Sequence, residues 1–362
     1  MQRTIILLLL MTLTGSALFA QKRKSVVSIV GDEFYMNGRP TYEGRYWKGN
    51  KIQGLLINSR MVQGIFDDLN PETRELFVYP DTKVWDPDRN TNEFVEAMGD
   101  WYKHGLNSFT INLQGGSPVG YGNQKNWLNS AFFEDGRLRP EFMGRLEKIL
   151  DKADDLNMVV MLGLFYFGQD QNLRDEEAIK TGVRNAVEWL FDKGYRNVLI
   201  EINNECNIRQ YDHEILKPAR VHELIEMVKE MERNGHRFLV STSYGGGFVP
   251  LPNVVKSSDY ILIHGNGVKS YEEMQLLIDK TRDVEGYRKM PVVVNEDDHF
   301  DFDKNRNNFV AAVEKYVSWG YFDYRKDGED FSVGYQTVPV DWRITSDRKK
   351  AFFNKVKEIT GR

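Results

Sequence analysis

Two glutamates in this chain each follow a short apolar run with the composition of a β-strand. Glu205 ends the run NVLIEINNE (197–205), and Glu296 ends the run PVVVNE (291–296). A strand that is buried on both faces tolerates a carboxylate only where the strand reaches a solvent-lined rim. Two carboxylates are also the minimum equipment for cleaving a glycosidic bond. One such glutamate alone is most simply a solvated charge or an arginine partner, whereas two in matching positions favour catalysis.

The elements that must position this pair follow a regular pattern, in which apolar strand-like runs alternate with helix-like segments. Eight such units in one chain predict a closed (β/α)₈ (TIM) barrel rather than an open doubly wound sheet, for which the Gly-x-Gly-x-x-Gly fingerprint is missing. Glu205 then ends the fourth strand and Glu296 the seventh, at the rim where barrel enzymes place their catalytic groups. The predicted strands are 52–57, 106–113, 158–164, 197–202, 237–242, 260–263, 292–294 and 321–324. The predicted helices are 92–104, 140–156, 176–193, 214–234, 271–284, 305–319 and 346–360.

Side-chain alternation assigns faces on the two strands that carry the glutamates. With a period of two, Glu201 and Glu205 share one face of the fourth strand, and Val294 and Glu296 share one face of the seventh. If those faces point into the barrel, both terminal glutamates enter one cleft. Glu201 would then lie in the barrel core, where a carboxylate needs a partner such as an arginine or lysine from an adjacent strand.

The N-terminal part of the chain predicts a leader and a hairpin. Residues 1–20 combine Arg3, an apolar stretch and a small residue, Ala20, which is typical of a secretory signal peptide; the alternative is an uncleaved anchor. Residues 21–362 would then form one exported barrel domain, periplasmic or extracellular in a bacterium and free of the membrane. Residues 25–39 predict a β-hairpin that caps the barrel, with turn signals at Gly31-Asp32 and Asn37-Gly38.

The composition limits the classes of partner. The 362 residues carry a net charge of −5 without a long basic run, which argues against a nucleic-acid partner. The single cysteine, Cys206, excludes an intramolecular disulfide and is best explained as a buried, inert thiol. Three adjacent residues, Asp297, Asp298 and His299, seldom converge on one ion, so we expect neither a metal nor a cofactor.

Asn204-Glu205, Glu296 and the hairpin sequence DEFYMNGRP (32–40) together resemble clan A glycoside hydrolases, the retaining (β/α)₈-barrel glycosidases. The resemblance covers nearly the whole chain after residue 20 and does not identify a family within the clan. It implies that Glu205 is the general acid/base, that Asn204 binds the sugar 2-hydroxyl, and that Glu296 is the nucleophile. His264 is similar to the clan's histidine near the nucleophile.

The chain departs from the clan pattern at two positions. Cys206 stands where many members have proline after the Asn-Glu pair. After His264 the sequence continues Gly265-Asn266, without the tyrosine that frequently bonds the nucleophile, so Asn266 or a tyrosine from another loop would take that place.

Four further residues are candidates for substrate binding. Arg60 follows the first strand and could reach the nucleophile, although a surface arginine is an equal alternative. Asn112 ends the second strand, and Tyr166 follows the third, where an aromatic ring can pack on a sugar face. Trp342 follows the eighth strand, where the clan commonly has a tryptophan under the reactive sugar; it is preferred to Trp319, which is interpreted as the end of a helix.

These observations predict a retaining glycoside hydrolase that acts on an oligo- or polysaccharide by double displacement. The alternatives are a carbohydrate-binding barrel without catalysis and a metal-assisted hydrolase. The sequence specifies neither the sugar nor the linkage.

Overall fold

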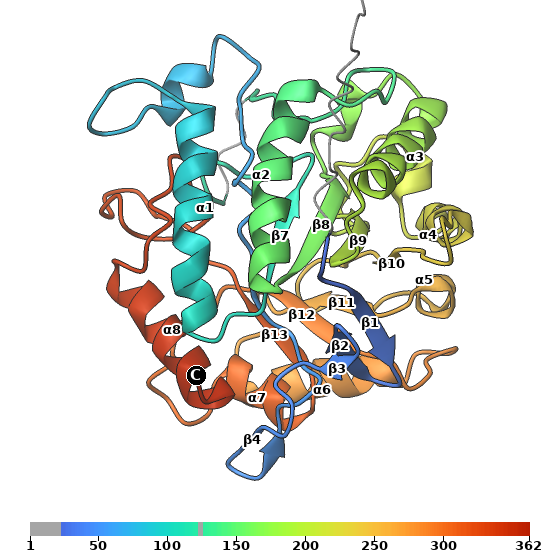
Figure 1. The fold of residues 1–362 in the computed structure, drawn as a ribbon, viewed down its shortest axis with the longest axis vertical. Helices are drawn as coiled ribbons and strands as arrows, with labels where there is room; N and C mark the ends of the chain where they lie inside the picture. Colours follow the sequence, from blue (N-terminus) through green and yellow to red (C-terminus); the bar gives the residue numbers. More distant parts are fainter. Residues whose placement is uncertain (1–22, 122–125) are drawn as a thin grey trace, which may run out of the picture.

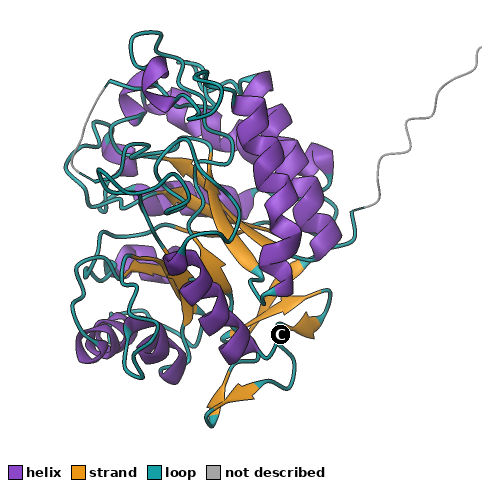
Figure 2. Ribbon diagram, turned by 90° about the vertical axis from the view of Figure 1, so that its left-hand side faces the viewer, coloured by secondary structure: helices purple, strands orange, loops and turns teal. Residues whose placement is uncertain are grey.

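The computed structural model describes residues 23–121 and 126–362, and it has the architecture of a (β/α)₈ barrel (Figures 1 and 2). The predicted signal peptide lies outside the described residues. Eight parallel strands form two four-stranded sheets, with the orders β10-β9-β8-β7 and β11-β12-β13-β6. Their bounds are β6 (Ile57–Ser59), β7 (Ser108–Asn112), β8 (Val159–Phe165), β9 (Val198–Asn203), β10 (Leu239–Ser241), β11 (Ile261–His264), β12 (Val292–Asp297) and β13 (Ser318–Tyr321).

Backbone hydrogen bonds join the two sheets into one barrel. Next to β6 and β7, the Met61 N–H donates to the Thr110 carbonyl (3.0 Å). At the other junction, the Asp259 N–H donates to the Val240 carbonyl (3.0 Å). The carboxyl ends of all eight strands therefore meet at one rim.

Helices cover the outside of the barrel, as Figure 2 shows. They are α1 (Pro87–Lys103), α2 (Pro140–Leu156), α3 (Glu176–Lys193), α4 (Val221–Glu230), α5 (Pro252–Ser257), α6 (Tyr271–Arg282), α7 (Asn308–Glu314) and α8 (Asp347–Thr360), with short 3₁₀ segments at Arg74–Phe77, Asp170–Asn172 and Glu214–Leu216. Helix α1 illustrates why they form: the Asp86 side chain caps the first turn by accepting from the Arg89 N–H. Phe94, Met98 and Trp101 then recur at helical spacing and bury one face against the barrel.

The predicted hairpin closes the opposite end of the barrel. Strand β1 (Val27–Val30) pairs antiparallel with β2 (Glu33–Met36), through a turn at Gly31 with φ of +64°. Short strands β3 (Arg39–Pro40), β4 (Tyr46–Trp47) and β5 (Asn50–Lys51) follow. Val27 and Phe34 pack with residues from the amino-terminal parts of barrel strands, among them Val159 and Val293. The expected cap is confirmed.

Several predicted boundaries are wrong. The first barrel strand starts at Ile57, where the prediction ended, and the fourth helix covers only 221–230 of the predicted 214–234. The eighth strand is Ser318–Tyr321, so Trp319 lies in a strand and not at the end of a helix. Helix α7 ends early because Tyr316 adopts a left-handed conformation (φ +56°), which frees the next residues to pair with β6.

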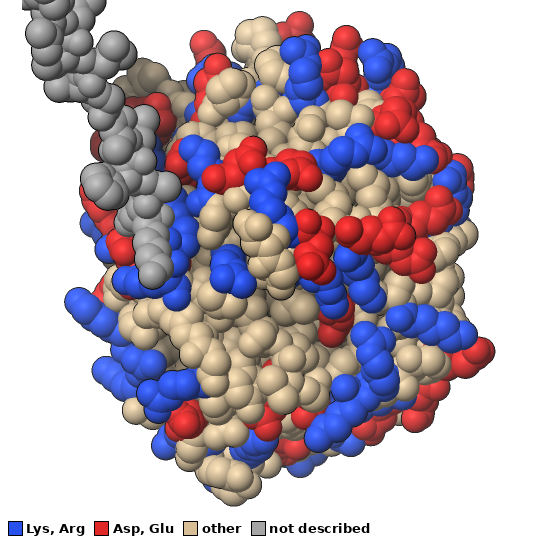
Figure 3. All heavy atoms as spheres, turned by 45° about the vertical axis from the view of Figure 1, so that its right-hand side comes forward, with Lys and Arg blue, Asp and Glu red and all other residues tan. Residues whose placement is uncertain are grey.

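The surface carries no single-sign stripe on the face shown in Figure 3, where acidic and basic side chains are interspersed. Among the described residues, no helix is both long and apolar enough to span a bilayer.

Candidate active site

Glu205 stands two residues beyond the end of β9, in a left-handed backbone conformation (φ +51°) that is uncommon for a residue other than glycine. A chain of hydrogen bonds holds this conformation. The Glu205 N–H donates to Ser243 Oγ (2.9 Å), and the Ser243 hydroxyl donates to Glu201 Oε1 (2.5 Å). The buried Glu201 therefore has a serine hydroxyl as its close partner, with Arg60 Nη1 farther away at 3.8 Å.

Glu296 lies in β12 after an irregularity of the strand. The register with β11 pairs Ile263 with Val294 and then His264 with Glu296, so Asn295 is an extra residue on this strand. The predicted sharing of one face by Val294 and Glu296 is therefore wrong. Val294 packs in the core cluster that includes the helices, whereas Val293 packs with the hairpin residues Val27 and Phe34 at the opposite end of the barrel. The bulge, which alternation cannot foresee, turns the Glu296 side chain into the site.

The structure brings the two glutamates together at one rim. Glu205, Glu296 and His264 each contribute one oxygen or nitrogen atom to a set within 4.8 Å of one another. The Glu296 side chain is only 7% exposed and that of Glu205 13%. Burial raises the pKa of Glu296 above that of an ordinary glutamate, while Arg60 and His264 oppose this rise.

Arg60 is buried and links Glu296 to Asn204, the neighbour of Glu205, so the surface alternative is wrong. Its Nε lies 2.7 Å from Glu296 Oε2, and its Nη2 donates to Asn204 Oδ1 (2.6 Å). The amide nitrogen of Asn204 consequently faces away from Arg60, because the oxygen takes this bond. The Tyr211 hydroxyl fixes the same residue by donating to the Asn204 carbonyl (2.5 Å).

His264 contacts both carboxylates and lies nearer to Glu205. Its Nδ1 is 2.8 Å from Glu205 Oε1 and 3.6 Å from Glu296 Oε2. Burial by itself lowers the pKa of His264, but the charge of Glu296 and the hydrogen bond to Glu205 outweigh it, so the pKa is raised. The contact engages Oε1 of the Glu205 carboxyl group.

Asn266 occupies the place of the expected tyrosine. Its Nδ2 donates to Glu296 Oε1 (2.5 Å) and contacts the Tyr121 hydroxyl (2.7 Å). Asn266 therefore contacts Glu296 in place of that tyrosine, as expected from the sequence. Tyr121, from the loop after β7, in turn contacts Asn266. Glu296 thus has one cationic and one neutral donor, on different oxygens.

A cavity of about 260 Å³ opens above the two glutamates. Tyr166 contributes an almost fully buried wall, and its hydroxyl forms a hydrogen bond with Ser117 Oγ (3.1 Å). Burial raises the pKa of the Tyr166 phenol, so the ring is neutral. The other lining residues include Arg60, Tyr121, Trp127, Phe167, Gln169, Phe322 and Gln336.

Four predicted substrate-binding residues are not among those that line this cavity. Asn204 and His264 contact the lining residues Arg60 and Glu205, whereas Asn112 and Trp342 are buried elsewhere. Asn112 is buried in the barrel against Gly163 of the neighbouring strand, where an added Cβ would approach its Oδ1 to 2.3 Å. Trp342 is 1% exposed: it stacks on Tyr335 and donates from Nε1 to Asn90 Oδ1 (3.0 Å). The indole ring packs against Phe94 and Trp101 of α1, so it presents no face to a sugar.

Sequence reasoning missed Phe322, Gln336 and Ser117. Phe322 directly follows β13, so a correctly placed eighth strand would have identified it as a rim residue. Gln336 comes from a distant loop and donates to the Gly116 carbonyl (2.5 Å), a contact without any local signal. Ser117 has φ of +47°, a strain that only the tertiary structure reveals.

Two groups of side chains among the described residues lie close enough together to hold a cation. At the glutamate pair, the Arg60 guanidinium already occupies Glu296, and a second cation there would be repelled. The triplet Asp297, Asp298 and His299 does converge within 4.8 Å, contrary to expectation. Asp297, however, accepts from His299 Nδ1 (2.6 Å) and Trp319 Nε1 (2.9 Å), which explains its burial without an ion.

Neither a protein-family model nor a curated protein matches this sequence. Solved structures do. A candidate glycoside hydrolase from Bacteroides vulgatus is 15% identical with a TM-score of 0.53, and the match covers 91% of this chain and 60% of that one. The endo-1,4-beta-mannanase of Rhizomucor miehei is 11% identical, with a TM-score of 0.55 and coverages of 93% and 99%. A glycoside hydrolase family 5 mannosidase from the same fungus is 12% identical, with a TM-score of 0.56 and coverages of 94% and 98%.

The chain thus spans less than two thirds of the Bacteroides protein but nearly all of the two fungal enzymes. At these identities the similarity concerns the fold. It confirms the (β/α)₈ barrel that the resemblance to clan A implied: this chain has the fold of glycoside hydrolase barrels.

Proposed function

We propose that the protein is a retaining glycoside hydrolase that cleaves O-glycosidic bonds of an oligo- or polysaccharide. The observation that carries this proposal is the spacing of the carboxylates, with one oxygen of each within 4.8 Å. Retaining enzymes hold their carboxyl groups about 5–5.5 Å apart, whereas inverting enzymes need about 6.5–9.5 Å to admit a water. The proposal takes further support from the fold, whose solved neighbours are described as glycoside hydrolases.

The proposed roles follow from the surroundings of each glutamate. Glu296, beside Arg60, attacks the anomeric carbon as a carboxylate and forms a glycosyl ester. Glu205 gives its proton to the departing oxygen, so the leaving group departs as an alcohol. A water that gives its proton to Glu205 then attacks the anomeric carbon, the bond from that carbon to the Glu296 oxygen breaks, and Glu296 is released as a carboxylate. Asn204, anchored through its amide oxygen, directs its nitrogen to a substrate hydroxyl.

The test uses aryl and alkyl glycosides with wild type, Glu205→Gln and Glu296→Gln. We expect Glu296→Gln to abolish turnover of both substrates. Glu205→Gln should lose about 10²–10⁴-fold on alkyl glycosides, the usual value of general acid catalysis, and less on aryl glycosides, whose leaving groups need no proton. Glu226→Gln, an exposed change on α4, is the matched control.

The first-formed sugar anomer, followed by NMR, should retain its configuration. Initial inversion contradicts the nucleophile role of Glu296. Binding of saccharides by the wild type without turnover favours the second candidate function, a carbohydrate-binding barrel. We further propose export through residues 1–20, which predicts a mature protein that starts near Gln21 by N-terminal sequencing.

A further inference from the structure

A second cavity, of about 520 Å³, adjoins the catalytic cavity on the side of the loops that follow β7 and β8. Asn126, Trp127 and Gly168 line both cavities. A linear ligand that leaves the glutamate pair across Trp127 therefore enters the second cavity directly.

Buried polar side chains hold the walls between the two cavities. Asp68 is fully buried, and its Oδ1 accepts from the backbone N–H groups of Asn70 and Leu128 (2.9 Å each). Gln169 is 4% exposed and donates from Nε2 to the Trp127 carbonyl (3.1 Å). Three loops that are distant in sequence are thereby joined, so the second cavity is a fixed part of the fold.

The described residues that line the second cavity are all uncharged. Besides the three shared residues, its described lining consists of Leu69, Asn70, Pro71, Leu128, Gln171 and Asn172. Amides suit sugar hydroxyls, and the apolar and aromatic groups suit sugar C–H faces. A carboxylate or sulfate here would lose hydration without meeting a cation among these residues.

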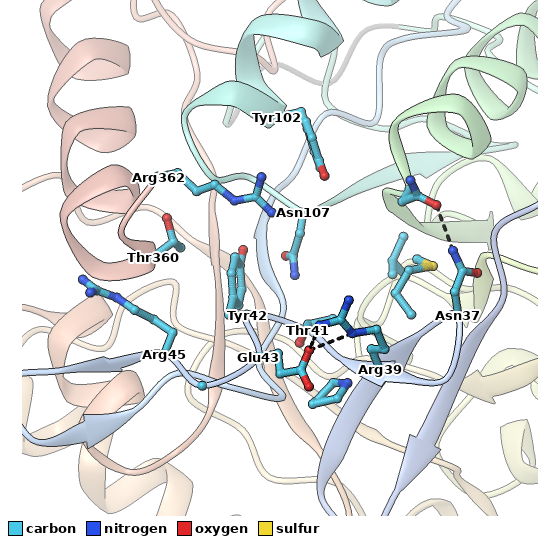
Figure 4. Close-up of a pocket in the computed structure, with 15 residues that line it drawn as sticks. Asn37, Arg39, Thr41, Tyr42, Glu43, Arg45, Tyr102, Asn107, Thr360 and Arg362 are labelled. Carbon is cyan, nitrogen blue, oxygen red and sulfur yellow. Dashed lines mark hydrogen bonds and ion pairs between the residues drawn. The ribbon is translucent and has the colours of Figure 1, made fainter.

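Another cavity, larger than either of these two, has the opposite character. It measures about 630 Å³ and lies beside the hairpin, with Arg39, Arg45 and Arg362 on its walls (Figure 4). Asn107 and Val159, at the amino-terminal ends of β7 and β8, also line it, so it is at the end of the barrel remote from Glu205. Size alone therefore does not identify the substrate path, whereas the shared wall at Trp127 does.

From the shared wall and the uncharged lining, we infer that the second cavity binds a further, uncharged sugar unit of the chain whose glycosidic bond lies at the glutamates. This inference rests on the proposed function and narrows it: the substrate is a neutral oligo- or polysaccharide long enough to cross Trp127. One packed sugar ring contributes about 1.4 kcal/mol, or about tenfold in affinity or kcat/KM.

The experiment compares uncharged gluco-, manno-, xylo- and galacto-oligosaccharides, from disaccharide to hexasaccharide, with a uronate series. For wild type, kcat/KM for a neutral series should rise about tenfold at the length that fills the second cavity. Trp127→Ala and the exposed Asn172→Ala should reduce this length gain, and the control Asn50→Ala, near the hairpin, should preserve it. Thermal unfolding midpoints establish that each variant is folded.

Calorimetric titration of the same ligands separates this inference from the proposed function. Binding that strengthens with ligand length and depends on Trp127, without hydrolysis, would support sugar binding in the second cavity and refute the proposed hydrolase activity. Length-independent binding and hydrolysis in wild type, or an undiminished gain in both variants, overturns the inference. An equal gain for the uronate series overturns the assignment of a neutral substrate.

Discussion

Replacement of Arg60 by methionine tests the electrostatics of the site most directly. The guanidinium lies 2.7 Å from Glu296 Oε2, and both side chains are nearly free of solvent (2% and 7% exposed). An opposite charge at this range lowers a carboxyl pKa by about 1–3 units. Arg60→Met should therefore raise the pKa of Glu296 by about that amount, which equals about 1.4–4 kcal/mol. Burial already raises this pKa, so in the variant Glu296, the proposed nucleophile, should become protonated at a higher pH than in the wild type.

The assay is the pH profile of kcat/KM on an uncharged aryl glycoside. The proposed mechanism needs ionised Glu296, so the acidic limb of this profile should move to higher pH by about 1–3 units. Below that limb, kcat/KM should fall about tenfold for each pH unit. Arg60→Lys keeps the positive charge but loses the second nitrogen that donates to Asn204, so it should move the acidic limb much less. Arg184→Met, an exposed change on α3, controls for general loss of charge.

Stability must be measured alongside, because removing one partner of a buried ion pair costs about 3–5 kcal/mol. An unmoved acidic limb in a folded Arg60→Met variant would refute the reasoning. Either Glu296 would then not be the titrating nucleophile, or Arg60 would not govern its ionisation.

Three further changes test other contacts. Asn266→Asp places a second carboxylate where the amide now donates to Glu296 (2.5 Å), so the acidic limb of kcat/KM should again move to higher pH, and Asn266→Ala should move it less. Gly116→Ala would bring a Cβ to 1.8 Å from the Tyr166 ring; KM should rise and the thermal midpoint fall as the ring is displaced. Burial lowers the pKa of Lys349 to about 7. The free energy of unfolding should therefore rise with pH by up to about 1.36 kcal/mol per unit between that pKa and the unfolded value near 10.4, and denaturant titrations of Lys349→Met should lack this increment.

The sign for Lys349 follows from its depressed pKa. Above about pH 10.4 the lysine is neutral in both states, and its burial carries no charge penalty. As the pH falls below about 10.4, the unfolded state takes up a proton that the buried lysine of the native state does not, so stability is lost progressively until the native lysine is protonated as well, below its pKa of about 7. A variant with the same pH dependence as wild type would show that another group is responsible.

The barrel and its rim residues were predictable because they depend on local patterns. Apolar runs of strand length alternate with amphipathic segments, and each run's last polar residue necessarily lies at the rim. Glu205 and Glu296 were found in this way, whereas Asn204 and His264 were assigned through the resemblance to clan A. Alternation misassigned the face of Val294, because a bulge adds one residue without a local sequence signal.

The role expected for Trp342 from the resemblance to clan A is wrong. Its position after the eighth strand suggested a sugar platform, but packing against Tyr335 and a bond to Asn90 bury it instead. Which aromatic reaches the cavity depends on loop conformation, and the loops here are long. Trp127 lines the cavity on a loop whose carbonyl at Trp127 accepts from Gln169, a residue of the loop after β8.

The sequence by itself determined the fold class and the two carboxylates, since strand periodicity and strand ends are properties of neighbouring residues. Only the tertiary structure decided what surrounds those carboxylates. Arg60 reaches Glu296 and Asn204 across the barrel, and Asn266 meets Tyr121 from another loop. Such contacts join residues separated by more than a hundred positions, and their charges and distances exist only once the barrel has closed.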